Sequence, residues 1–94
     1  MSQNSSTGHT CSLLREDEVL HKGLSISLDL SGDPEQPHIS ASILREQNPT
    51  EFEVYDQFQM VLDDGRSGEV VVSEVREIRD GLYIVVFSFL SGLK

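Results

Sequence analysis

The chain has 94 residues, a single cysteine and a formal net charge of −9, from 16 acidic and 7 basic residues. This length suits one domain. The lone cysteine excludes an intrachain disulfide framework and a four-cysteine zinc site. The negative charge disfavours binding to the phosphate backbone of nucleic acids and to anionic membrane surfaces, and its simplest role is solubility. We therefore expect no nucleic-acid partner and no membrane partner.

The first ten residues are polar and show no apolar periodicity. We predict that residues 1–10 are a disordered tail and that residues 11–94 form one β-barrel domain. The tail lacks the basic and apolar regions of a signal peptide. The longest apolar run, 82–87, is far shorter than the ~20 residues that a membrane-spanning helix needs. We expect the protein to be cytoplasmic.

The segment 11–22 is ambiguous. Leu13-Leu14 and Val19-Leu20 are two apolar pairs whose separation fits neither a regular helix nor a regular strand. A helical turn, a strand and an irregular arm packed on the rest of the domain all remain open. Residues 24–30 are clearer, because leucine and isoleucine alternate there with serine and aspartate, as in a strand with one face on the core.

The following segments continue the strand pattern. Glycine and proline predict a turn over 31–37, and alternation returns over 39–43 before a polar break. In 52–62 one face carries apolar side chains except at Asp56, which predicts a break or a bulge at that residue. The apolar positions of that face are Phe52, Val54, Phe58, Met60 and Leu62.

Two Asp-Gly turns, Asp64-Gly65 and Asp80-Gly81, separate the last three β-rich runs. Such turns between runs of Val, Ile, Phe and Tyr are typical of antiparallel hairpins. Residues 70–72 and 82–87 are apolar on both faces, which favours central strands. Six short strands, meander-type connections and no long helix predict an all-β fold, either a small antiparallel six-stranded barrel or a closed sandwich.

Residues that could perform chemistry do not form a known motif. His9, His21, His38 and Cys11 lack the spacing of zinc ligands, so we predict no metal site. The loop 63–68 lacks the ligands and flanking helices of a calcium loop, and a hairpin turn explains it. No serine elbow or glycine-rich phosphate loop occurs. We predict a protein that is not an enzyme and has no cofactor; a site assembled across a dimer is a weaker alternative.

The segment 54–93 resembles the second half of a PilZ domain. The resemblance rests on the run that ends at Leu62, the Gly65 turn, the strand that begins at Gly68 and the final strand after Asp80-Gly81. The upstream strands, 24–30 and 38–44, have the order found in the six-stranded barrel of that family. The resemblance implies a bacterial-type regulatory domain.

The PilZ family binds cyclic di-GMP through an Arg-x-x-x-Arg motif before the barrel and an Asp/Asn-x-Ser-x-x-Gly motif after the second strand. Guanidinium groups in such motifs hold phosphates and guanine edges with paired hydrogen bonds. In this chain Arg15 is followed four residues later by Val19, and 44–49 does not match the serine motif. The resemblance therefore implies a degenerate member that does not bind the nucleotide.

The last strand-like run has apolar side chains on both faces, and only one face can point into a barrel. We expect the segment 11–22 to cover part of the other face and a protein partner or a second copy to cover the rest. The predicted interface residues are Tyr83, Val85, Phe87, Phe89, Leu13 and Leu14. We thus predict a non-catalytic protein-interaction or regulatory module. The alternative is a small-molecule or nucleotide-binding barrel that uses non-standard residues.

Overall fold

The computed structural model describes residues 7–33 and 36–90, and all the regular structure in these ranges is β-strand. No helix in these ranges is long and apolar enough to cross a membrane. The strands are β1 (Thr7–Arg15), β2 (Glu18–Asp33), β3 (Gln36–Arg45), β4 (Gln57–Leu62), β5 (Ser67–Arg79) and β6 (Leu82–Phe89).

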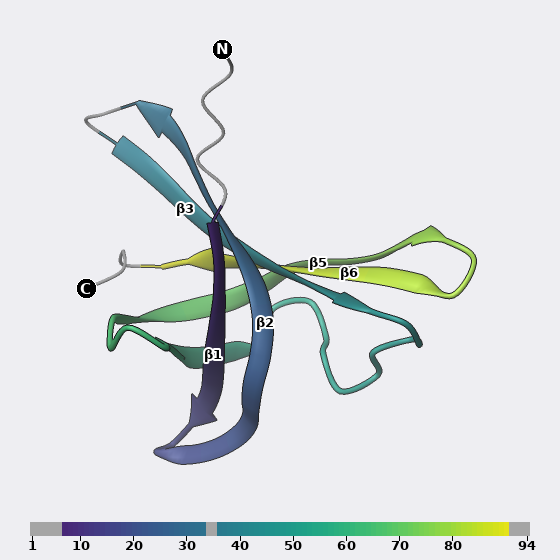
Figure 1. The fold of residues 1–94 in the computed structure, drawn as a ribbon, viewed down its shortest axis with the longest axis horizontal. Helices are drawn as coiled ribbons and strands as arrows, with labels where there is room; N and C mark the ends of the chain where they lie inside the picture. The colour runs from purple at the N-terminus through teal and green to yellow at the C-terminus, as the bar shows by residue number, and fades with distance from the viewer. Residues whose placement is uncertain (1–6, 34–35, 91–94) are drawn as a thin grey trace.

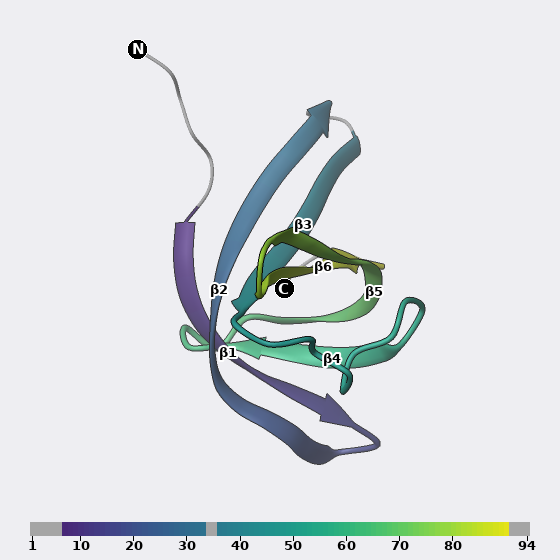
Figure 2. The same ribbon diagram turned by 90° about the vertical axis from the view of Figure 1, so that its right-hand side faces the viewer.

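The strands form a closed antiparallel barrel in the order β1-β2-β3-β6-β5-β4, in which β1 pairs with β4 to complete the ring (Figure 1). The predicted all-β barrel is confirmed, and the sandwich alternative is not adopted. Hairpins connect all consecutive strands except β3 and β4, so the predicted meander is wrong at that one connection. The β1–β2 hairpin projects toward the bottom of Figure 1 and the β5–β6 hairpin toward the right, and Figure 2 shows how strongly β5 curves.

The ambiguous segment 11–22 is the β1–β2 hairpin, and neither a helical turn nor an irregular arm. Arg15 pairs with Glu18, and the two residues between them, Glu16 and Asp17, have φ angles of 53° and 66°. Positive φ at both central positions is the requirement of a two-residue hairpin turn that matches strand twist. The strand β1 starts at Thr7, so the predicted tail is wrong for residues 7–10, and residues 1–6 lie outside the described ranges.

The alternation in the sequence determines which side chains enter the barrel. In β2, Ile26 and Leu28 are buried while Ser25 and Ser27 are exposed, as predicted. The same alternation holds in β4 and β6. The buried apolar side chains of the described residues are Cys11, Leu13, Ile26, Leu28, Ala41, Ile43, Phe52, Phe58, Met60, Leu62, Val70, Val72, Val85, Phe87 and Phe89.

The connection between β3 and β4 contains the predicted break at Asp56, because β4 begins at the next residue. Residues 52–56 are not part of the strand, so the strand-like run predicted over 52–62 is a strand only from residue 57. The Asp56 carboxylate accepts a hydrogen bond from the backbone N–H of Glu53 at 3.0 Å, which closes a local turn. Phe52 is buried from this loop, whereas Val54 is 42% exposed instead of pointing inward.

A β-bulge interrupts β5 at Ser73. Val72 pairs with Phe87 and Glu74 pairs with Val86, so Ser73 is the extra residue on the β5 side. The Ser73 hydroxyl donates to the carbonyl oxygen of Val86 at 3.1 Å. The bulge shifts the alternation of β5 by one residue, and Val75 rather than Glu74 therefore packs against the core.

Candidate functional site

The predicted interface residues are mostly in the core. Leu13, Val85 and Phe87 have no exposed surface, and Phe89 is 9% exposed. These four side chains fill the barrel, so the interface prediction has to be corrected for them: they are not on a surface that a partner can reach. Tyr83 and Leu14 are half-buried.

The opposite row of β6 lies on the outside of the barrel. Leu82, Ile84 and Val86 are half-buried there, and Leu44 of the neighbouring strand β3 lies opposite Ile84 with 60% of its surface exposed. We call Leu44, Leu82, Ile84 and Val86 the outer strip. Four adjacent apolar side chains on the solvent side of a barrel are unusual enough to suggest a contact surface.

The surroundings of the outer strip differ on its two sides. On one side, β2 presents Ser25, Ser27 and Asp29 at its outward positions, and a hollow of about 520 Å³ lies between them and the outer strip. On the other side, Arg76 of β5 pairs with Ile84 across the sheet and forms an ion pair with Glu74 at 2.9 Å. The strip is therefore apolar, with a polar, partly acidic border.

Phe52 fills one end of the barrel. Its ring lies 6.0 Å from that of Phe58 and 5.7 Å from that of Phe87, both in edge-to-face geometry, and 4.9 Å from that of His21. Arg45 lies over the outer part of this cluster, with its guanidinium carbon 5.8 Å from the Phe52 ring centre. Because side chains occupy this end, a ligand cannot enter the barrel there without displacing Phe52.

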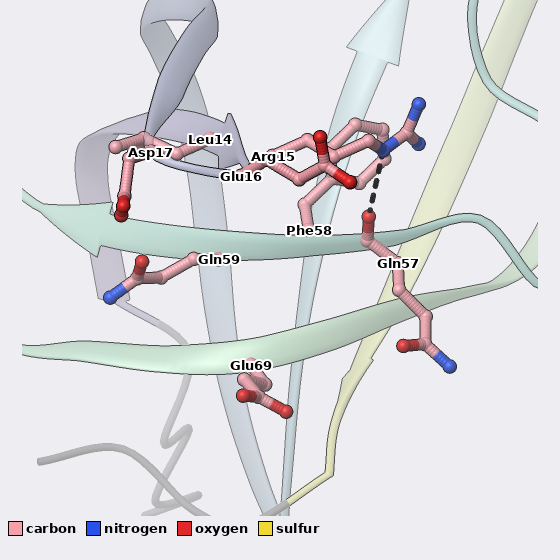
Figure 3. A pocket seen from close by; sticks show the side chains of 8 residues that line it. All are labelled: Leu14, Arg15, Glu16, Asp17, Gln57, Phe58, Gln59 and Glu69. Carbon is pink, nitrogen blue, oxygen red and sulfur yellow. Dashed lines mark hydrogen bonds between the residues drawn. The ribbon is translucent and has the colours of Figure 1, made fainter.

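A hollow of about 290 Å³ lies beside this end, next to Arg15 (Figure 3). The Arg15 guanidinium carbon is 4.6 Å from the Phe58 ring centre, and its Nε donates to the carbonyl oxygen of Gln57 at 3.4 Å. Glu16, Asp17 and Glu69 also line the hollow. These carboxylates oppose the approach of an anionic ligand to Arg15.

At the other end of the barrel, hydrogen bonds of Asp63 connect the start of β1 to the β4–β5 turn. Its carboxylate accepts hydrogen bonds from the backbone N–H of Thr10 at 3.3 Å and pairs with Nδ1 of His9 at 3.1 Å. The backbone N–H of Asp63 donates to the carbonyl oxygen of Thr10 at 2.9 Å. The His9 hydrogen bond is the largest cause that lowers the pKa of Asp63, followed by the Thr10 N–H.

Cys11 lies one residue further along β1 and is buried. Burial raises the pKa of its thiol from 9.0 to about 11, and the nearby charge of Asp63 adds to the rise. Since the thiolate is the reactive form, this cysteine is poorly suited to be a nucleophile at neutral pH. His21 belongs to the aromatic cluster at the opposite end, and the side chain of His38 lies outside the described ranges.

The sequence-based interface prediction fell on the row of β6 that faces the core, because both rows of β6 are apolar. The pairing of β6 with β3 distinguishes the two rows. Phe87 and Val85 pair with Ala41 and Ile43, which are buried, whereas Ile84 pairs with Leu44, which is exposed.

No protein-family model matches this chain, and no curated protein or solved structure is significantly similar to it.

Proposed function

We propose that the chain is a non-catalytic protein-interaction module of regulatory type, PilZ-like and cytoplasmic, whose contact surface is the outer strip. The observation that carries the proposal is the 60% exposure of Leu44 beside Ile84, on a barrel whose other outward rows include the serines of β2. An exposed cluster of apolar side chains is costly in water, and in soluble proteins it commonly marks an interface.

The partner of this strip is a protein segment that combines apolar and basic side chains. The apolar groups would lie on Leu44 and Ile84, and the basic groups would face Asp29 and the acidic remainder of the surface. The net charge of −9 supports this choice, because it attracts a cationic segment and repels a second acidic copy.

A selection from a random peptide library on the immobilised protein tests the proposal. We expect the selected peptides to contain apolar residues together with Lys or Arg, and to shift the NMR signals of β3 and β6. Leu44→Glu should weaken their binding by tenfold or more, because it places a charge in the centre of the contact. Gln59→Glu is the matched control, since it adds the same charge at an exposed position of β4, which is not a neighbour of β3 or β6 in the barrel.

Equal loss of binding in both variants would show that only charge matters, and would contradict the proposal. So would peptides whose NMR shifts map away from the outer strip. Light scattering on the wild type adds a separate outcome: a dimer that dissociates in Leu44→Glu would replace the basic partner with a second copy of the chain.

The alternative function, small-molecule binding, has its main support in the hollow beside Arg15.

A further inference from the structure

Three metal-ligating side chains meet at the end of the barrel where β1 begins. His9 belongs to β1, and Asp63 and Asp64 follow directly after β4. One ligand atom from each side chain lies within 4.8 Å of the other two. Zinc binds imidazole nitrogen and carboxylate oxygen at ~2.0–2.2 Å, so modest side-chain movements would place all three atoms around one ion. Since His9 and Asp63 are 54 residues apart, sequence spacing does not reveal this group.

The chemistry of the three side chains fits a cation. One imidazole and two carboxylates form a mixed nitrogen and oxygen ligand set, which suits zinc better than magnesium or calcium, since both of these prefer oxygen alone.

We infer that His9, Asp63 and Asp64 form a zinc site at the surface of the barrel. Three protein ligands leave a coordination position for water, as in open zinc sites. The ion would join β1 to the β4–β5 turn, where hydrogen bonds between Thr10 and Asp63 already connect these segments.

Arg66 competes with the ion for Asp64. Its Nε donates to one carboxylate oxygen of Asp64 at 2.9 Å, and its backbone N–H donates to the other oxygen at 3.0 Å. A zinc ion at Asp64 therefore shares the carboxylate with the guanidinium group or displaces it. It follows that Arg66 reduces the affinity of the site, and that its removal would strengthen zinc binding.

Calorimetric titration of the full chain with ZnCl₂ at pH 7 tests the inference. We expect one zinc ion per chain, and no saturable heat with MgCl₂ at the same concentrations. His9→Ala and Asp64→Asn should each weaken zinc binding by about tenfold or more, since each removes a ligand. Asp80→Asn is the matched control, because Asp80 also precedes a glycine in a hairpin turn but lies in the other hairpin, β5–β6. The zinc affinity of Asp80→Asn should equal that of the wild type.

Arg66→Gln should bind zinc more tightly than the wild type, because it removes the group that competes for Asp64. NMR spectra of every variant confirm that the barrel is folded and identify the residues whose signals zinc shifts. The inference is overturned by absence of saturable zinc binding, by unchanged affinity in His9→Ala, or by equal losses in Asp64→Asn and Asp80→Asn.

Discussion

The ring of Phe52 stands at 89° to the ring of Phe87, with the two ring centres 5.7 Å apart. Phe52 comes from the loop between β3 and β4, whereas Phe87 lies within β6. Edge-to-face contacts of this kind stabilise aromatic pairs beyond the area that they bury. A loop side chain thus completes the hydrophobic core at the end of the barrel that the strands leave open.

Phe52→Ala should lower the free energy of unfolding by about 3–5 kcal/mol, because it leaves a cavity between Phe58, Phe87 and His21. Urea denaturation followed by circular dichroism measures the change. Val54→Ala, two residues later in the same loop and 42% exposed, is the control and should change stability by no more than about 0.5 kcal/mol. Similar losses in the two variants would show that the loop, not the Phe52 ring, supports the core.

Substitutions at two neighbouring residues of β6, Val86 and Phe87, test which row of this strand faces the core. Phe87→Ser should unfold the domain or destabilise it by about 3–5 kcal/mol, because the Phe87 ring is completely buried. Val86→Ser should leave a folded barrel, because Val86 points outward and is half-buried. Thermal melts of the two variants measure the difference. The reverse order of stability would mean that β6 faces the core with its other row.

Asp63→Asn should remove a part of the acid sensitivity of the fold. The pKa of Asp63 lies below its ordinary value of 3.8, mainly because His9 forms a hydrogen bond with the carboxylate. A carboxyl group of this kind contributes stability that is fully present above its pKa in the unfolded chain and is lost as the pH falls through its lower pKa in the folded state. The wild type should therefore lose more stability than Asp63→Asn on acidification below pH 3.8.

Urea denaturation at a series of pH values between neutrality and pH 2 measures this dependence. Asp80→Asn removes one carboxylate from the β5–β6 turn, away from β1, and serves as the control. Parallel stability curves for the wild type and Asp63→Asn would contradict the assigned role of Asp63.

The thiol of Cys11 should react slowly with a disulfide reagent such as DTNB at pH 8. Cys11 is buried, and burial raises the pKa of its thiol to about 11, so the reactive thiolate is scarce. A Ser27→Cys variant, which adds an exposed thiol, should show one fast and one slow reaction. Both thiols should react quickly in urea. Fast reaction of the native wild type would indicate that β1 opens readily from the barrel.

Cyclic di-GMP should give no saturable heat in a calorimetric titration. The Arg15 guanidinium group lies over Phe58 and 3.9 Å from a carboxylate oxygen of Asp56, and Glu16 and Asp17 follow it in the chain. A negative ligand meets unfavourable charge on this approach. Val19→Arg alone should not create binding, because the serine motif is also lacking. Saturable binding to the wild type would favour the nucleotide-binding alternative.

The sequence predicts the barrel well where one periodicity dominates. Serine alternates with apolar residues along β2, and Asp-Gly turns mark the β4–β5 and β5–β6 hairpins. It predicts β1 poorly, because the turn at Glu16 and Asp17 has the positive φ angles of a tight hairpin without glycine or asparagine. The strand alternation in this hairpin is also interrupted by a register shift between Cys11 and Leu13.

The candidate sites depend on contacts that local patterns do not contain. Both rows of β6 are apolar, so only its pairing with β3 shows that Ile84 is outside and Phe87 inside. His9 and Asp63 meet because β1 closes the ring against β4. Such pairings depend on the topology of the whole barrel, so the sequence of one short segment does not determine them.

The bulge at Ser73 also has a consequence for aggregation. The pairing of β5 with β4 runs from Ser67 to Val71 and ends before the bulge. Within the described residues, the part of β5 after the bulge therefore has a neighbouring strand only on the β6 side. Such an open edge is where two chains can join their sheets. Here the edge is kinked by the bulge and carries exposed charges of both signs at Glu74, Arg76, Glu77 and Arg79. Natural β proteins use such features to prevent edge-to-edge polymerisation, and we expect them to keep the long β5–β6 hairpin from pairing with other chains.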